Sequence, residues 1–208
     1  MSTNRPTRRR GALAREEAVE AARDLLLAGG ASAVTLKAVG ERMGVGHANL
    51  IHHFGSAAGL QGAVMDRMVR DLAARLDSGL GAGMGQAPAA PDRAAMLDQV
   101  FDAFGEGGAA RLGAWMVMQG EAGRADAFAE VVRDQAERLA GLAGGGEEAR
   151  DRARAVVMTA VYMAFADGLI GEVLTQMLEA PRDLGRGLAA RAIEAALNED
   201  LEPGGDRS

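Results

Sequence analysis

The sequence contains no cysteine among its 208 residues and only one lysine, Lys37. The absence of cysteine excludes disulfide bonds, thiolate metal sites and a cysteine nucleophile. This agrees with a reducing compartment, and we expect a cytoplasmic protein. The single lysine reflects an arginine-biased composition that is rich in alanine and glycine.

Strand-forming patterns are also missing. No stretch shows sustained alternation of apolar and polar residues, and β-branched residues are sparse. Apolar residues recur instead at helical spacings, and a hydrophobic content of 48% argues against global disorder. The sequence therefore predicts an all-α fold.

The usual signatures of membrane proteins, secreted proteins and enzymes do not occur. We find no run of about 18 apolar residues and expect no membrane-spanning helix. The arginine-rich N-terminus lacks the apolar stretch of a secretory signal. No Gly-x-Ser-x-Gly motif or phosphate-binding glycine loop occurs, and His47, His52 and His53 are not spaced as a helical zinc pair. We expect no enzymatic activity, no cofactor and no metal site.

The charge is unevenly distributed along the chain. The net charge is −6, but residues 1–60 carry +3 and residues 61–208 carry −9. A basic end on an acidic protein indicates a polyanion contact confined to that end. The alternative is that Arg8, Arg9 and Arg10 form only a solvated tail.

Helical spacing and breaker residues divide the chain into segments. Gly29-Gly30, Gly144-Gly145-Gly146 and Pro181 end helical patterns, and glycines and prolines are concentrated at 78–91. The expected organisation is a flexible basic arm at 1–12, a helix-turn-helix domain at 13–56, a connecting helix at 57–77, a Gly/Ala/Pro-rich linker at 78–91, a larger helical domain at 92–200 and a tail at 201–208.

Residues 35–54 have the pattern of a helix-turn-helix. Thr35 is a good N-cap for a helix that ends near Met43, and Gly44 suits a tight turn. A third short helix follows, with Leu50 and Phe54 directed to the core, and Ser56 can cap the next helix. A helix-turn-helix consists of two helices, of which the second enters the DNA major groove. In this chain that second helix of the motif is the third short helix.

Small and polar residues begin that third helix, as base reading requires. Gly46, His47 and Ala48 leave room for bases, and Asn49 can pair bidentately with adenine. Lys37, one turn into the preceding helix, is a candidate for a base or phosphate contact. The alternatives are that Lys37 is merely solvated and that His53 only packs between helices.

Several features occur together in this region: an apolar first helix ending at Gly29-Gly30, Thr35 opening the second helix, Met43-Gly44-Val45 at the turn, Leu50, and His53-Phe54 followed by Ser56 and Leu60. With them, residues 15–65 resemble the TetR family of one-component transcriptional repressors. The resemblance implies a three-helix DNA-binding head and a larger helical domain for ligand binding and dimerisation. It implies base contacts from Lys37, His47, Ala48 and Asn49, and phosphate contacts from Thr35, His52 and His53.

Four positions depart from the family pattern. Ile51 stands where Tyr is common, Ala57 where Lys is common, Gly46 where Ser is usual and Asn49 where Thr is usual. The resemblance implies that Ile51 and Ala57 each remove one phosphate contact, so the salt dependence expected of DNA binding is weaker. A basic arm along the DNA backbone is one possible compensation.

The larger domain holds most of the bulky apolar side chains. Apolar clefts with a few polar groups are common ligand sites, and the resemblance implies a pocket for a hydrophobic effector. Asp167 is either a pocket acid or the mark of a helix bend, and each pocket candidate has plain core packing as its alternative. The pocket candidates are Phe104, Trp115, Met118, Phe128, Tyr162 and Phe165.

The last two helical segments, 147–179 and 182–199, carry more apolar surface than one face needs. The resemblance implies that they pair two subunits, which would place two heads on a palindromic operator. We therefore expect a homodimeric, ligand-responsive repressor with double-stranded DNA and a small effector as partners. The alternative is a ligand-binding or interaction protein of the same fold with weak or no specific DNA binding.

Overall fold

The computed structural model describes residues 5–81, 92–121 and 126–198. This part of the chain contains helices and no strand, so the predicted all-α class is confirmed. The elements are α1 (Arg5–Gly29), η1 (Ala31–Ala33), α2 (Leu36–Met43), α3 (His47–Phe54), α4 (Ala57–Gly81), α5 (Arg93–Phe104), α6 (Ala109–Met118), α7 (Asp126–Leu142), α8 (Glu147–Ala166), η3 (Asp167–Gly171), α9 (Glu172–Met177) and α10 (Leu184–Asn198).

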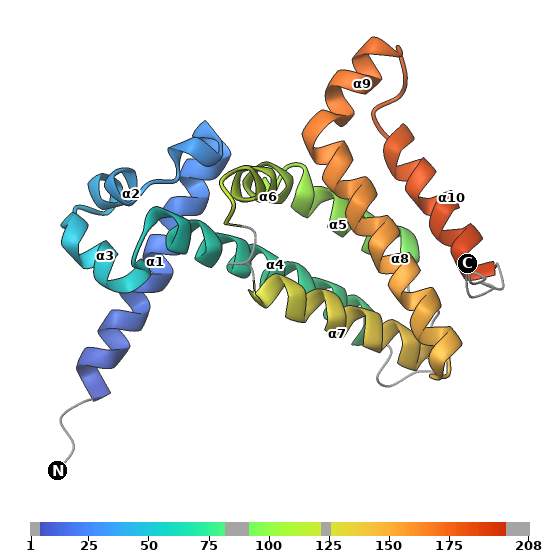
Figure 1. Ribbon diagram of the computed structural model, residues 1–208, viewed down its shortest axis with the longest axis horizontal. Helices are drawn as coiled ribbons and strands as arrows, with labels where there is room; N and C mark the ends of the chain where they lie inside the picture. Colours follow the sequence, from blue (N-terminus) through green and yellow to red (C-terminus); the bar gives the residue numbers. More distant parts are fainter. Residues whose placement is uncertain (1–4, 82–91, 122–125, 199–208) are drawn as a thin grey trace, which may run out of the picture.

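Two groups of helices share the long helix α4 (Figure 1). At one end, α1, α2 and α3 pack on one another and on the beginning of α4. Helix α6 packs on α4 and on η1 beside the head, while α5 and α7 also pack on α4, and α8 lies between α7 and α10. Helix α4 therefore connects the N-terminal head to the larger helical body.

Short polar side chains start several of these helices. The Thr35 Oγ1 accepts a hydrogen bond from the amide of Ala38 at 3.1 Å, and the Ser56 Oγ accepts one from Gly59 at 3.1 Å. These two predicted caps are confirmed. The Asp92 Oδ1 caps α5 in the same way through Ala95 at 3.0 Å. Each cap contributes about 1 kcal/mol by satisfying an otherwise free amide.

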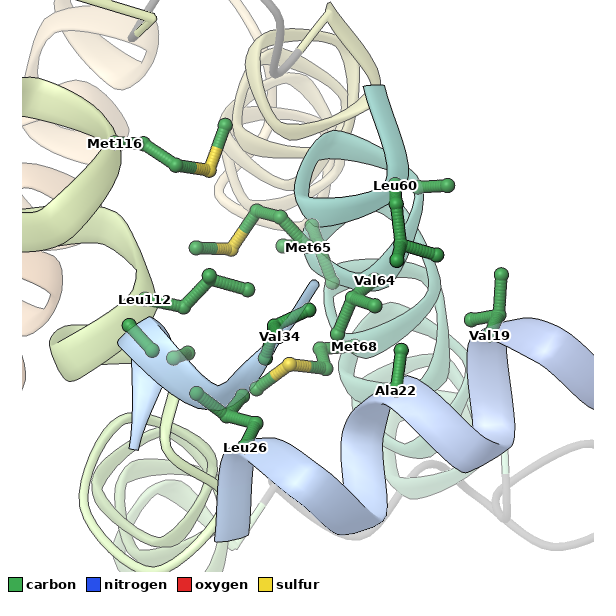
Figure 2. Packing of buried hydrophobic residues seen from close by; sticks show 14 of the residues in the cluster. Val19, Ala22, Leu26, Val34, Leu60, Val64, Met65, Met68, Leu112 and Met116 are labelled. Carbon is green, nitrogen blue, oxygen red and sulfur yellow. The ribbon is translucent and has the colours of Figure 1, made fainter. Parts of the chain in front are cut away.

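The core crosses from the head into the body. Leu26 of α1, Val34 beside η1, Val64 of α4 and Leu112 of α6 are completely buried. Figure 2 shows that these side chains meet around Met65 and Met68 of α4. Burial of each side chain of this size contributes about 1.5–3 kcal/mol to stability. The head is therefore packed stably against both α4 and α6.

Two expected boundaries differ in the structure. Helix α1 begins at Arg5, so Arg8–Arg10 continue a helix where we expected a flexible arm; residues 1–4 lie outside the described residues. Helix α4 continues to Gly81, past the expected linker start at 78, because glycine is tolerated in a helix that packing stabilises. The remainder of the expected linker and the expected tail lie outside the described residues.

The expected single helix over 147–179 is interrupted. A π-helical turn, η3, separates α8 from α9 and begins at Asp167. Such turns insert an extra residue and change the phase of the following helix. Of the two interpretations of Asp167, the structure therefore supports the helix irregularity.

Candidate DNA-binding site and ligand cavity

Helices α2 and α3 meet at two glycines. Gly44 has a φ of 67° and forms the turn after α2. A Cβ on Gly40 would lie 3.0 Å from the carbonyl oxygen of Val45 and 3.5 Å from Cδ1 of Leu50. The sequence interpretation identified Gly44 but missed Gly40, whose only signal is a glycine inside a helical pattern.

The first turn of α3 presents its side chains to solvent. His47, Ala48 and Asn49 are exposed, whereas Leu50 and Phe54 are buried beneath them. Gly46 is the N-cap, and its carbonyl accepts a hydrogen bond from the amide of Asn49 at 3.0 Å. Small and polar side chains at the exposed start of a helix are suited to the major groove.

The other predicted contact residues surround this turn. The Lys37 side chain is 82% exposed, and its Nζ lies 3.9 Å from Oε1 of Glu41. An exposed pair at this distance is weak, so it leaves the lysine available. Thr35 is half-buried at the start of α2, where its hydroxyl is already the cap acceptor.

The histidines at the end of α3 differ in their environments. His52 is exposed, and His53 is half-buried between its neighbours, with ring centroids 5.7 Å from His52 and 6.3 Å from Phe54. His53 therefore packs against both neighbouring rings while part of its side chain stays exposed. Within the described residues, no group of three or more His, Asp or Glu side chains is placed to hold a metal ion.

Contacts from α1 hold helices α2 and α3. Nη2 of Arg42 on α2 lies 2.7 Å from Oδ2 of Asp24 on α1. The guanidinium carbon of Arg15 lies 5.3 Å from the centroid of the Phe54 ring on α3. Both contacts lie at the surface, where each contributes up to about 1 kcal/mol. They orient the helix pair while the buried leucines and valines supply the stability.

Comparison with known families identifies this region. Residues 18–64 match the family model described as "Bacterial regulatory proteins, tetR family". Residues 18–64 are therefore similar to the N-terminal region of the TetR family. The matched residues contain the cap at Thr35, the turn at Gly44 and all of α3, so the helix-turn-helix assignment is confirmed.

The fold of the whole chain is similar to a solved structure. A transcriptional regulator from Rhodococcus sp. Rha1 aligns with a TM-score of 0.61 and 20% sequence identity, covering 91% of this chain and 99% of that chain. At this identity the likeness concerns the fold. The search of curated proteins gave no significant match.

The larger helical domain contains a cavity of about 480 Å³. Residues of α4, α5, α7, α8 and α10 line it, and Ala109 of α6 contributes at one end. This volume lies within the range of small-molecule sites, and most of the lining side chains are apolar. The cavity is therefore suited to a largely apolar ligand.

The structure separates the six predicted pocket residues. Phe104 and Phe128 line the cavity. Phe165 instead packs against Phe104, with ring centroids 6.2 Å apart, and Trp115 is half-buried against the core without lining the cavity. Met118 is 74% exposed and Tyr162 is 66% exposed, so these two lie on the surface of the chain.

Three polar residues of the cavity were missed by the sequence interpretation. They are Arg93, Gln135 and Arg152. Each lies in a segment with many charged residues, so its charge resembles that of an ordinary solvated helix face. Only the packing of five helices shows that these three side chains reach the same cavity.

An apolar surface runs along α8, η3 and α9. Its exposed members are Met158, Tyr162, Leu169, Ile170, Val173, Leu174, Met177 and Leu178, and we call them the α8–α9 face. The helical run Glu147–Met177 is long and apolar enough to cross a membrane, contrary to our expectation from the sequence. However, α8 also packs against α5, α7 and α10. One packed side and one exposed apolar side suit contact with another protein surface better than lipid on all sides.

Two arginines have raised pKa values. Burial alone lowers the pKa of Arg186, but hydrogen bonds to Asp102 and Asp98 and their charges outweigh it. The hydrogen bond and charge of Asp71, helped by Glu20, raise the pKa of Arg67. Both guanidinium groups stay charged at any physiological pH. Arg186 therefore acts as a permanent link between α10 and α5.

Proposed function

We propose that this protein is a cytoplasmic, ligand-responsive repressor that binds a palindromic operator as a homodimer and is released by a small hydrophobic effector. The observation that carries the proposal is the exposed first turn of α3, with His47, Ala48 and Asn49 directed to solvent. This turn belongs to a head fastened to α4, and α4 also lines the cavity. The role is regulatory, without a catalytic step.

The DNA contacts divide into two kinds. Lys37, His47, Ala48 and Asn49 reach base edges, and Gly46 permits close approach of the backbone. Thr35, His52 and His53 contact phosphates. The exposure of Lys37 and of the first turn of α3 supports the first group, since base contacts require side chains that are free to enter a groove.

We propose that the DNA-binding domain comprises residues 13–56 and that α4 connects it to a ligand-binding and dimerisation domain within 92–200. The α8–α9 face is the dimer surface. Its exposed apolar side chains would be covered by the same face of a second copy, as a twofold interface requires. Two heads would then address two half-sites.

The effector acts through residues shared by the cavity and the core. Met68 and Ala109 both line the cavity and belong to the core cluster that contains Leu26 and Val34 of the head. Figure 2 shows Met68 beside both of these head residues. A ligand that displaces α4 or α6 therefore changes the packing of the head. A coupling of about 1–3 kcal/mol would be sufficient for regulation.

The test is binding of the purified protein to the intergenic DNA beside its own gene, across a series of salt concentrations and with random competitor DNA. We expect competitor-resistant binding, two subunits per site, and affinity that falls steeply with salt. Equal binding to operator and competitor would favour the alternative, a ligand-binding protein of this fold without specific DNA recognition. Ile51 and Ala57, which stand where the resemblance implies phosphate contacts, make this comparison necessary.

A further inference from the structure

The cavity has a distinctive chemical lining. Of the described residues that line it, only Arg93, Gln135 and Arg152 have polar side chains, and none is acidic. The remaining lining residues are alanine, valine, leucine, isoleucine, methionine and phenylalanine. An apolar cavity that contains two positive charges and no negative charge favours a ligand with an apolar body and an anionic group.

The two arginines lie toward one end of the cavity. Arg93 is the first residue of α5, whereas Phe104, which also lines the cavity, is the last. At 1.5 Å per residue these positions are about 16 Å apart along the helix. Arg152 lies in the second turn of α8, next to the end of α7, which is the end of the body far from the DNA-binding head (Figure 1). The cavity is thus elongated and has its charges near the distal end.

The two arginines at this end can only donate hydrogen bonds, and the amide oxygen of Gln135 is the acceptor among the three polar side chains that line the cavity. A guanidinium group carries donors only. The Gln135 Nε2 already donates to Oδ1 of Asp77 at 3.1 Å. Arg93 forms no ion pair or hydrogen bond within the described part of the chain, and Arg152 pairs with Glu148 at the surface side. A carboxylate would give Arg93 an acceptor and would give Arg152 a further one beside Glu148.

We propose that the cavity binds an elongated apolar molecule that ends in a carboxylate, with the carboxylate held between Arg93 and Arg152. The identification of this molecule as the effector rests on the proposed function, whereas the binding site itself does not. Its apolar body would lie along α5 toward Phe104, Met68 and Ala109. Those last two residues are the ones shared with the core around the head.

The test compares three ligands with the same ten-carbon chain: decanoate, 1-decanol and decyltrimethylammonium. Calorimetry on the purified full-length protein, with each ligand below its aggregation concentration, gives the three dissociation constants. We expect decanoate to bind at least about tenfold more tightly than decanol, because a hydrogen-bonded charge adds to burial of the same chain. The cationic ligand should bind most weakly.

Two variants and one control locate the charge. Arg93→Gln and Arg152→Gln should each reduce the decanoate affinity about tenfold or more while leaving the decanol affinity within about twofold. Arg150→Gln is the matched control, since Arg150 is also near the start of α8 but pairs with Glu137 and does not line the cavity. Thermal unfolding checks that each variant is folded. Because Arg93 is exposed, Arg93→Gln should fold even if Arg152→Gln does not, and it then tests the site alone.

The outcomes separate this inference from the proposed function. Equal affinity for decanoate and decanol, or unchanged decanoate binding in both variants, overturns the carboxylate site while an apolar effector still stands. If none of the three ligands binds, the carboxylate site is overturned as well. Tight decanoate binding that requires both arginines but does not release DNA supports the site and rejects its role as the effector site.

Discussion

The side-chain Nε2 of Gln61 on α4 donates a hydrogen bond to the backbone carbonyl of Val34 at 3.1 Å, and both residues are buried. Val34 immediately precedes the cap of α2, so this bond joins the connecting helix to the segment that begins the helix-turn-helix. It is a polar contact inside an otherwise apolar junction. A buried carbonyl without this partner would be costly.

Substitution Gln61→Ala should therefore destabilise the head. We expect a loss of about 1–3 kcal/mol in the free energy of unfolding, because the Val34 carbonyl loses its partner and is not solvated. Chemical denaturation measures the loss. Gln119→Ala, at an exposed glutamine that ends α6, is the control and should change stability by less than about 0.5 kcal/mol. Equal effects of the two substitutions would show that the buried bond has no special role.

The local chemistry of the head was predictable from the sequence. Thr35, Gly44 and Ser56 act through atoms within a few residues of themselves, so their roles follow from residue type and spacing. The close approach at Gly40 was not predictable in the same way. It depends on the crossing of α2 and α3, which no local pattern specifies.

The cavity was less predictable because helix phase decides which side chains enter it. Met116 is 2% exposed and Met118, two positions later on α6, is 74% exposed. The two residues have the same chemistry, but a helix turns about 200° between them. Composition identified the apolar domain, whereas the packing of α6 against α4 and the head determined which methionine is buried.

Substitution Asn49→Ala should impair specific DNA binding. We expect a loss of about 1–3 kcal/mol on the operator, since the proposed bidentate contact of Asn49 with a base would be removed, and little change on random DNA. Fluorescence anisotropy on both DNAs measures the difference. An equal loss on operator and random DNA would mean that Asn49 contacts the backbone and does not read a base.

Substitution Ala57→Lys should strengthen the salt dependence of DNA binding. Ala57 begins α4 directly after the Ser56 cap, where a lysine would add a phosphate contact at a helix N-terminus. The slope of log affinity against log salt should become steeper by about 0.9. Ala129→Lys adds the same charge at an exposed position of α7 and should leave the slope unchanged. A parallel change in both variants would indicate a general charge effect.

Substitution Val173→Asp should separate the subunits. Val173 is 49% exposed on the α8–α9 face, and a carboxylate there would be buried without a partner in a twofold interface. Sedimentation analysis should show a monomer for the variant and the proposed dimer for the unmodified protein. Leu27→Asp introduces the same charge at a residue of α1 that is 43% exposed, and this control should remain dimeric. A dimeric Val173→Asp variant would place the subunit contact elsewhere.

Substitution Gly40→Ala should disturb the angle between α2 and α3. The added Cβ would lie 3.0 Å from the backbone oxygen of Val45, an atom that the turn at Gly44 holds in place, so the helices must separate by a few tenths of an ångström. We expect a loss of about 1–3 kcal/mol in unfolding free energy and a weaker affinity for the operator. Gly46→Ala is the matched control for stability, because its Cβ would meet nothing within 4 Å and its φ of −68° suits any residue. If Gly40→Ala is as stable as Gly46→Ala, α2 and α3 can adjust, and the close contact does not determine the angle at which α3 faces the DNA.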